Sequence, residues 1–598
     1  MRRLWYWLRG HDDEQGAALV AVVGVGAVLM VLAATMLGVA ASGTVKSSAD
    51  EDWTNAMSAA YAGLADYQSK LTADNSYTQY GNPASSFSAG STFTGQASNP
   101  AFSIAAGSWV SVPTSNTGGV KEYYRYEVNN RNYYSNGVIK VRVTGKSGNA
   151  TRSLVADLKG TGFIDYLYFT DYEVSDPAIT GSTCTPEHLT DSGYSSRVDC
   201  NRIQFASADV LEGPVRTNDE FTICGATFDM SVESTAADGA YVKPTGCNSP
   251  TFNKAYNGGR TKHVPSIALP ATNANLKQET RSDLTSSTVP NPGCLYTGPT
   301  SIVFNSDGTM TVRSPWTKKT EIAGDPASSG TTPAACGTVG TGTNQLGSTA
   351  GQTLAVPNQN LLYVQNVPAT TGDPNYWASN AQPNTKSCKG ADGTTTGNGI
   401  GWPLTNEDTS QLDATTPYGC RNGDVFVSGT VNAKATVAAQ NYVYVTGNLT
   451  YQDKKDDILG LVGQQAVWVS NPVSKSTSCS YFGCSTSYTP INGYKDREID
   501  AAIASNEGTF TVQNYDQGSK SLGTLTVYGS IAQKFRGPVA QSSTGGNVGS
   551  GYVKDYQYDA RLQYEAPPKF LQPVSTNYGI TTQVEVKAAY KPDGTPTS

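Results

Sequence analysis

The chain has 598 residues, a formal net charge of −7 and only 15% charged residues, whereas an average soluble domain has about 25%. Phosphate contacts need clustered Lys and Arg, and the sequence has no such cluster, so we expect no nucleic-acid partner. The length predicts several domains or one elongated repetitive domain. Gly (61 residues) and Tyr (34 residues) are abundant, which is typical of strand-rich exported proteins and unusual for a helical enzyme.

An uncharged apolar segment at 17–41 follows a short N-terminal leader, 1–16. As a helix it spans about 37 Å, enough to cross a hydrocarbon core of about 30 Å. Arg2, Arg3 and Arg9 favour a cytoplasmic N-terminus, which places the large C-terminal part outside the cell membrane. A cleaved secretory signal is the weaker alternative, because its apolar region has only about 7–15 residues. The segment predicts a single membrane-spanning helix.

Apolar residues at helical spacing continue beyond this segment. Steps of three and four residues predict that the helix extends through 42–75, from the bilayer into a soluble domain. An amphipathic helix that only packs on its own domain is compatible with the same pattern. The positions are Trp53, Met57, Ala60, Tyr61, Leu64, Tyr67 and Leu71.

Two motifs around the apolar helix, GAALV at Gly16–Val20 and AMSAAYAGLADY at Ala56–Tyr67, resemble the N-terminus of PilX-type minor pilins and related type IV pilin-like proteins. The resemblance implies cleavage by a prepilin peptidase between Gly16 and Ala17. It also implies a membrane location with incorporation in a pilus, and other pilins or pilus-assembly components as partners. Most pilins carry a glutamate five residues into the mature chain, where this sequence has Ala21, so the resemblance favours a minor over a major subunit.

Strand patterns follow a connection rich in Ser, Gly, Asn and Tyr. Alternating residues at Gly107–Pro113 and Glu122–Val128 predict two strands, and Gly137–Thr144 with Thr151–Leu158 predict a hairpin. A long helix followed by a small antiparallel sheet is the layout of a pilin head. The resemblance therefore extends, more weakly, to an antiparallel β domain at 76–175.

An internal repeat marks the remaining range, 176–598. Val425–Val431 (VFVSGTV) and Val443–Leu449 (VYVTGNL) share three apolar positions and a glycine at an offset of 18 residues, and Leu525–Ile531 (LTVYGSI) is a third copy. Strands that return at this interval predict stacked coils of a β-helix-like solenoid. An antiparallel β-sandwich is the alternative. The expected fold is thus mainly β with a long N-terminal α-helix.

Three further segments carry local signals. Gly162–Val174 reads as a further strand or as a crossover into the next domain. The Asp-Gly pair within Ser301–Ser314 predicts a hairpin. Glu498–Ser505 (EIDAAIAS) is the one short helical candidate in the second half of the chain.

Ten cysteines, an even number, all follow the apolar segment on the expected outer side. This pattern fits an oxidising compartment with up to five disulfides. We expect neighbours in sequence to pair, Cys479 with Cys484 first, because a tight loop closes at low entropic cost. The sequence has no CxxC and only three histidines, so we expect no metal site. The candidates for disulfide bonding are Cys184, Cys200, Cys224, Cys247, Cys294, Cys336, Cys388, Cys420, Cys479 and Cys484.

The common catalytic and cofactor-binding motifs do not occur in the sequence. We therefore expect no catalytic residues and no cofactor, and predict a structural or adhesive surface protein of the pilus whose tyrosines and Thr/Asn-rich loops contact a glycan or a host or abiotic surface. The alternative is a membrane-anchored extracellular β-helix enzyme that acts on polysaccharide through paired carboxylates about 5–9.5 Å apart. The candidate carboxylates are Asp453, Asp456, Asp457, Glu498 and Asp500.

Overall fold

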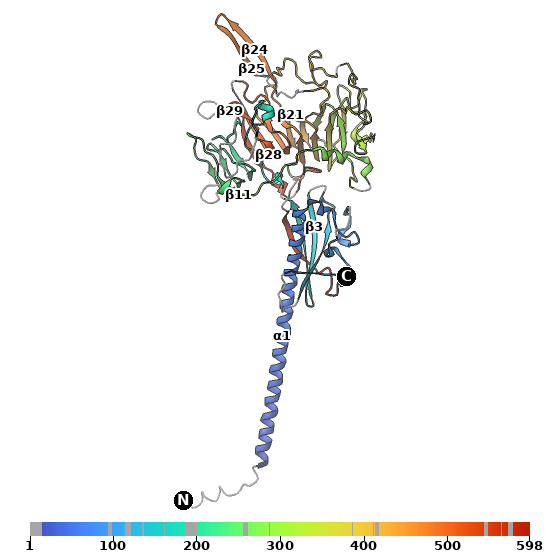
Figure 1. Cartoon of the computed structure of the whole chain (residues 1–598), viewed down its shortest axis with the longest axis vertical. Coiled ribbons are helices and arrows are strands. Elements are labelled where there is room, and N and C mark those ends of the chain that lie inside the picture. The colour runs from blue at the N-terminus through green and yellow to red at the C-terminus, as the bar shows by residue number, and fades with distance from the viewer. Residues whose placement is uncertain are drawn as a thin grey trace, which may run out of the picture.

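Three parts follow one another along the molecule: a long helix, a small antiparallel domain and a large domain of mostly parallel strands (Figure 1). The fold is mainly β, as expected. The structure is a computed structural model. It describes residues 15–93, 98–113, 121–133, 137–160, 162–185, 200–254, 261–285, 288–385, 387–410, 412, 418–518, 520–542, 548–563, 565–571 and 578–597.

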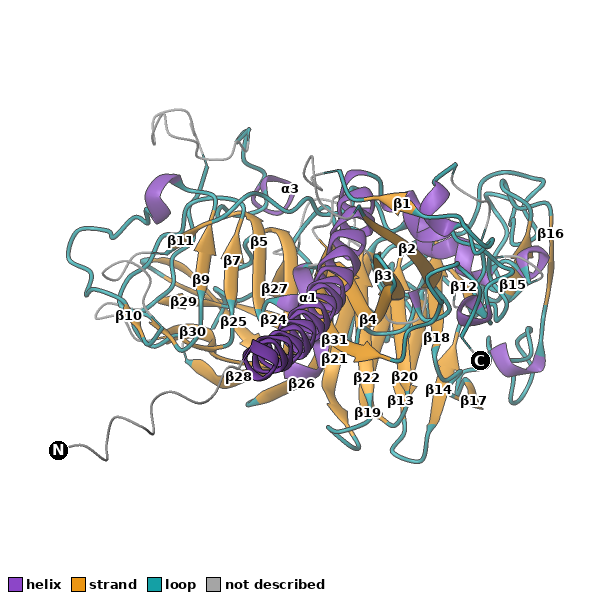
Figure 2. Ribbon diagram, turned by 90° about the horizontal axis from the view of Figure 1, so that it is seen from below, coloured by secondary structure: helices purple, strands orange, loops and turns teal. Residues whose placement is uncertain are grey.

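The long helix is α1 (Gln15–Ala73), one uninterrupted element of 59 residues. At about 1.5 Å per residue it is about 88 Å long. The apolar segment 17–41 and the predicted extension as far as Ala73 thus lie on a single helix, and the prediction of one continuous element is confirmed. Its first half projects away from both domains, and its second half packs on the small sheet (Figures 1 and 2).

The small domain is an antiparallel sheet with the strand order β1–β2–β3–β4–β31. The predicted hairpin is confirmed: Val141 lies opposite Ala156, and the turn contains Gly148 with a φ of +49°. The strands are β1 (Val110–Ser111), β2 (Glu122–Asn129), β3 (Val138–Ser147), β4 (Ala150–Gly160) and β31 (Tyr578–Val586).

The last strand of the chain completes the small sheet. Tyr578 pairs with Gly160 and Val586 with Ser153 in antiparallel register. From the sequence, this strand falls in the range 176–598, whereas the structure places it in the antiparallel domain predicted at 76–175. Local patterns reveal a strand but not a partner more than 400 residues away, so the pairing was not foreseen. The large domain is an insertion between β4 and β31.

One parallel ladder runs through the whole large domain (Figure 2). Each strand pairs with the next in parallel register. The antiparallel β-sandwich is therefore not the architecture of this domain. In spatial order the strands are β12 (Cys294–Thr297), β18 (Asn360–Gln365), β20 (Lys434–Ala439), β22 (Ile458–Gly463), β26 (Arg497–Ser505), β28 (Ser521–Phe535), β5 (Tyr168–Tyr172), β7 (Val215–Thr217), β9 (Val232–Ser234) and β11 (Lys262–His263).

A second parallel ladder accompanies the first and shares β26 and β28 with it. The two best repeat copies stack here, because Val425 pairs with Val443. A third, short ladder joins β21, β23 and β27. The additional strands are β13 (Thr300–Phe304), β19 (Val425–Val431), β21 (Tyr442–Tyr451), β30 (Val548–Tyr558), β6 (Val210–Glu212), β8 (Thr227–Phe228), β10 (Thr251–Phe252), β23 (Ala466–Val469) and β27 (Phe510–Val512).

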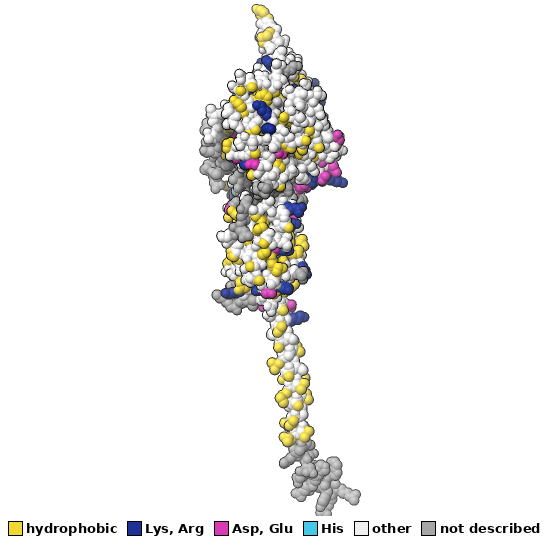
Figure 3. Space-filling view, turned by 90° about the vertical axis from the view of Figure 1, so that its right-hand side faces the viewer, with side chains coloured by type: hydrophobic (Ala, Val, Ile, Leu, Met, Phe, Trp, Pro, Cys, Tyr) yellow, Lys and Arg dark blue, Asp and Glu magenta, His cyan; other side chains and the backbone are white. Residues whose placement is uncertain are grey.

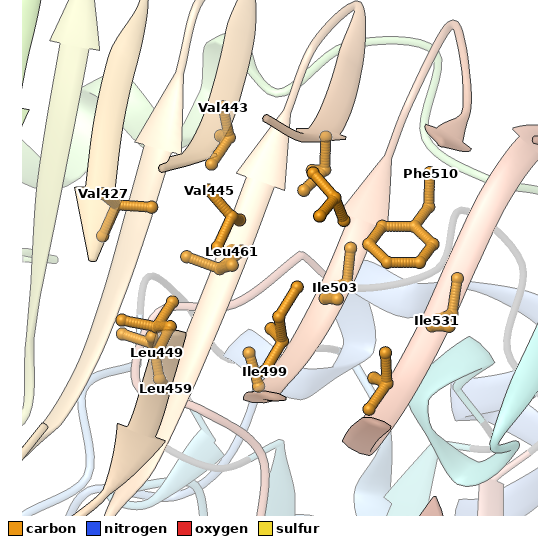
Figure 4. Close-up of a cluster of buried hydrophobic side chains, with 14 of the residues drawn as sticks. Val427, Val443, Val445, Leu449, Leu459, Leu461, Ile499, Ile503, Phe510 and Ile531 are labelled. Carbon is orange, nitrogen blue, oxygen red and sulfur yellow. The ribbon is translucent and has the colours of Figure 1, made fainter. Parts of the chain in front are cut away.

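Aliphatic side chains from successive strands fill the interior of the large domain. Val427 and Val445 are adjacent across β19 and β21, and Leu461 and Ile503 continue the layer on β22 and β26 (Figure 4). All four are fully buried. Burial of such apolar surface stabilises the stack by about 25 cal/mol per Å².

The short peripheral elements are antiparallel pairs and single helical turns. Ser301–Ser314 forms the expected hairpin of β13 and β14. The helical prediction for Glu498–Ser505 is wrong: these residues form most of β26, because neighbours on both sides provide a backbone ladder that outweighs the helix propensity of alanine. The remaining described strands and the short helix α3 are β14 (Thr309–Arg313), β15 (Glu321–Ala323), β16 (Ser329–Thr331), β17 (Gln352–Ala355), β24 (Val473–Ser480), β25 (Gly483–Pro490), β29 (Ala540–Ser542) and α3 (Pro177–Thr180). The 3-10 turns are Asn75–Gln79, Ser86–Ser88, Pro100–Phe102, Phe163–Asp165, Ala237–Gly239, Ala274–Thr280, Ser282–Leu284, Ala334–Cys336 and Ala560–Gln563.

Candidate functional site: the apolar helix and the sheet that holds it

The projecting half of α1 exposes apolar side chains along its length, and Figure 3 shows one face of it. Its large hydrophobic residues are 48–73% exposed. A helix that is apolar all round belongs in a bilayer or among other helices, because its hydration in water is unfavourable. Among the described helices, α1 is long and apolar enough to cross a membrane. The exposed large hydrophobic residues of this half are Leu19, Val20, Val22, Val23, Val25, Val28, Leu29, Met30, Val31, Leu32, Met36, Leu37, Val39 and Val45.

The polar groups of this half are satisfied within the helix itself. The Thr35 hydroxyl donates to the Leu32 carbonyl at 2.8 Å, and the Ser42 hydroxyl donates to the Val39 carbonyl at 2.9 Å. Such internal bonds are what a hydrocarbon environment requires of a polar side chain. Gly24 and Gly38 have open space around them, so a neighbouring helix can approach the backbone closely there.

The second half of α1 packs against the face of the small sheet through small residues. Ala56, Ala60 and Gly63 are buried, and a Cβ on Gly63 would lie 2.7 Å from the Tyr124 ring. On the sheet side, a Cβ on Gly145 would overlap the Ala56 carbonyl oxygen. At Gly145 the helix and the sheet thus meet at backbone distance, and no larger side chain fits at this position.

The predicted apolar stripe of this half is only partly buried. Leu64, Tyr67 and Leu71 lie in the core of the small domain, whereas Trp53 and Tyr61 are 53% and 51% exposed. The stripe therefore predicted the helix correctly, and only part of it is buried in the small domain.

Polar contacts fix the helix on the sheet at both ends of the contact. The Ser147 hydroxyl donates to Asp52 at 3.1 Å, and the Tyr126 hydroxyl donates to Asp66 at 3.1 Å. Burial raises the pKa of Tyr124 to about 12, and the charge of Asp66 adds to this effect. The phenol therefore stays neutral at physiological pH.

The C-terminal strand contributes to the same attachment. Arg152 on β4 donates to the Glu585 carboxylate on β31 at 2.8 and 2.7 Å, and its guanidinium lies 4.8 Å from the Trp53 ring. The Gln68 side chain also donates to the Tyr578 carbonyl. Helix, hairpin and final strand are therefore held together by contacts that sequence analysis missed, because β31 carries no local signal of its partner.

The predicted processing site lies at the free end of α1. Gly16 and Ala17 belong to its first turn, and Ala21 is exposed. The residues before Gln15 lie outside the described part of the chain.

The structure joins the ten cysteines as sequence neighbours. Each pair encloses a short segment, with sequence separations from 5 to 42 residues. Disulfides between neighbours constrain local excursions from the parallel stack and do not link distant parts of it. The pairs are Cys184–Cys200, Cys224–Cys247, Cys294–Cys336, Cys388–Cys420 and Cys479–Cys484.

The candidate carboxylates of the alternative enzyme are engaged in local contacts. Lys454 binds Glu498 at 3.0 Å and the fully buried Asp500 at 3.4 Å. Asp457 accepts from the Asp453 backbone at 2.7 Å, and Asp456 lies 3.3 Å from the Lys434 ammonium group. These contacts stabilise turns and strand ends.

Comparison with known proteins adds little to this geometry. No protein-family model matches the sequence, and no curated protein matches it. A solved structure that aligns with the chain is the competence-associated pilin ComZ from Thermus thermophilus. The alignment covers 90% of this chain and 98% of that one, with 11% identity and a TM-score of 0.23. Similarity at this level carries no argument about fold or function.

Proposed function

We propose that this chain is a type IV pilin-like protein of the minor, PilX-like kind, with a structural or adhesive role and no catalysis. The observation that carries the proposal is the continuity of α1. The first half of this helix offers an apolar surface to a bilayer or to other helices, and its second half packs in the core of the antiparallel domain. This is the arrangement that the N-terminal resemblance implies.

The large domain then serves as the displayed part of the molecule. It lies at the end opposite the apolar half of α1 (Figure 1). In this proposal successive coils of a β-helix-like solenoid each contribute one strand to a parallel ladder, and the arginines of the leader keep the N-terminus in the cytoplasm. Contacts with a glycan or with a host or abiotic surface would involve the outer loops and tyrosines of this domain.

Processing of the leader tests the proposal directly. Expressed in its own cells, the protein should begin at Ala17, as read by N-terminal sequencing. Gly16→Val should block the cut and leave Met1 at the N-terminus, whereas Gly10→Val, in the same leader, should leave the cut unchanged. A mature wild-type chain that begins at Met1 or after Ala41 would contradict the proposal.

Association with a pilus is tested separately. The full chain, extracted from membranes in mild detergent, should co-purify with pilins or pilus-assembly components. Gly24→Leu together with Gly38→Leu fills the open positions on α1 and should reduce this co-purification without loss of membrane insertion. Insertion with no pilus component in any preparation would leave a membrane anchor and remove the pilin assignment.

A further inference from the structure

A hairpin projects from the large domain at the end of the molecule farthest from α1 (Figure 1). It consists of β24 and β25, which pair from Val473 and Pro490 at the base to Ser480 and Gly483 at the end. With eight residue pairs at about 3.3 Å each, it extends about 26 Å. Residues 475–487 are all exposed, so this part of the hairpin is not packed into the body of the domain.

The hairpin ends in two aromatic side chains that contact only each other. Tyr481 and Phe482 are 99% and 97% exposed, and their ring centroids lie 5.7 Å apart at an interplanar angle of 87°. They form the loop between the two strands and are referred to below as the hairpin tip. Hydrophobic side chains mark this end of the molecule in Figure 3. Aromatic residues exposed to this degree are unusual on a soluble surface and indicate an interaction site.

The hairpin tip is held in shape. The Cys479–Cys484 disulfide links directly opposite residues just below it. The Phe482 backbone donates to the Ser480 hydroxyl at 3.3 Å, and this hydroxyl donates to the Gly483 carbonyl at 3.4 Å. An isolated two-stranded hairpin is marginally stable in water, so the disulfide preserves a shape that would otherwise fray. A preformed tip loses little conformational entropy when it binds.

The stem carries almost no charge. Its strands are rich in Ser and Thr, and their one charged residue, Lys475, lies 3.6 Å from Asp408 near the base. The outer part of the hairpin is therefore neutral, and a charged partner such as nucleic acid or an anionic headgroup finds nothing to pair with.

The shape of the hairpin tip distinguishes two neutral partners, a small ligand such as a sugar and a lipid surface. Binding sites for small ligands, sugars included, are concave and aim several polar groups at the ligand. The hairpin tip is convex, and its two rings are perpendicular, so they form no common flat platform. A convex tip with two aromatic side chains suits insertion into the apolar part of a lipid bilayer. Tyr is favoured at the boundary between headgroups and acyl chains, and Phe adds apolar area below it.

We infer that the hairpin tip inserts Tyr481 and Phe482 into the interfacial region of a lipid bilayer other than the one that holds α1. The partner is a neutral, zwitterionic lipid surface. The inference uses the membrane insertion of α1 only to set which end of the molecule is free, and it does not depend on pilus assembly.

The test uses the full chain in phosphatidylcholine vesicles and labelled, protein-free acceptor vesicles of the same lipid. Flotation first confirms that α1 has inserted, so a failure of the anchor is seen before any acceptor is added. The wild-type protein should then capture acceptor vesicles, and capture should persist at about 0.5 M NaCl, where charge contacts are screened. Tyr481→Ser with Phe482→Ser should reduce capture by about tenfold or more, because the apolar surface is lost.

Matched variants separate the hairpin tip from the stem. Tyr488→Ser removes an aromatic ring from the same hairpin, near its base, and should leave capture unchanged. Cys479→Ser with Cys484→Ser keeps both tip rings but releases the loop, and should weaken capture. Thermal unfolding of the two double variants should match that of the wild type, because residues 475–487 are all exposed.

Three results would overturn the inference. The first is equal capture by the wild type and the tip variant. The second is capture only of acceptors with anionic lipid, lost at high salt, which would indicate a charged surface elsewhere. The third is retention of the wild type, but not of the tip variant, on an insoluble neutral polysaccharide without vesicle capture, which would assign the tip to a glycan.

Discussion

Arg536 and Glu173 form a buried ion pair with an N–O distance of 2.7 Å, and their side chains are 1% and 0% exposed. They lie 363 residues apart in sequence. Glu173 follows β5, where the chain enters the large domain, and Arg536 follows β28, a strand that comes late in the sequence but lies next to β5 in the stack. The Arg536 backbone also donates to the Tyr172 and Val174 carbonyls at 3.1 Å. The ion pair thus holds β5, which comes early in the sequence, beside β28, which comes late.

Removal of one partner should be costly, because it leaves the other charge buried. We expect Glu173→Gln to lower the free energy of unfolding of the large domain by about 3–5 kcal/mol. The measurement is the denaturant midpoint of the large-domain transition. Glu498→Gln disrupts the exposed pair with Lys454 and should change the free energy of unfolding by less than about 1 kcal/mol. Equal shifts in the two variants would mean that the buried pair does not stabilise the insertion.

The close contact between α1 and β3 predicts a strong effect at Gly145. A Cβ there would overlap the Ala56 carbonyl, so Gly145→Ala should push the helix from the sheet and cost about 1–3 kcal/mol. Protease sensitivity of the segment around Ala56 should rise. The control is Gly579→Ala on β31, where the nearest atom to a new Cβ is 3.9 Å away. That variant should behave like the wild type, and equal protease sensitivity of Gly145→Ala and the wild type would refute the close contact.

The sequence predicted those elements whose signals are local. The apolar run and the stripe from Trp53 to Leu71 predicted α1, and the alternation on either side of Gly148 predicted the hairpin β3–β4. The repeat at Val425 and Val443 predicted a pairing that the structure contains. Each of these signals lies within a few tens of residues of its partner, so pattern and structure coincide.

Features that depend on distant residues were not predictable in this way. The pairing of β31 with β4 and the insertion of β5 beside β28 join segments that carry ordinary strand patterns and no sign of their partners. The helix predicted at Glu498–Ser505 was wrong for a related reason, since its alanines form a strand only because β22 and β28 lie on either side. For the candidate site, the apolar half of α1 was predicted. The hairpin tip was not, although two aromatic residues between Cys479 and Cys484 were a visible signal.

The disulfides should differ in their effect on stability. Cys294 and Cys336 are buried and close a loop with a separation of 42 residues. A chain-entropy estimate gives about 4 kcal/mol for such a loop, so Cys294→Ser with Cys336→Ser should lower the unfolding midpoint strongly. Cys479→Ser with Cys484→Ser affects only the exposed hairpin and should leave the midpoint unchanged. Intact-mass analysis with alkylation should find no free thiol in the wild type, and ten free thiols would refute the bonding.

The last prediction concerns Asp424, which precedes β19 and is fully buried. The Tyr442 backbone donates to one carboxylate oxygen at 3.3 Å. Burial raises the pKa of Asp424 to about 7, and hydrogen bonds from the Tyr442 backbone and from the Asn422 and Asn441 side chains lower it only in part. In the unfolded chain the carboxyl group ionises at its ordinary pKa of about 3.9.

Between pH 4 and 7 the folded protein therefore holds one more proton at Asp424 than the unfolded chain does. Stability contributed by this group is present at low pH and is lost as the pH rises toward 7. Asp424→Asn should remove this dependence, so that wild type and variant diverge by about 2 kcal/mol between pH 5 and pH 8. Asp307→Asn is the control, because this exposed carboxyl has its pKa lowered by Thr309 and titrates below that window. Denaturant unfolding at several pH values gives the comparison, and parallel profiles of wild type and Asp424→Asn would show that Asp424 is ionised in the folded state.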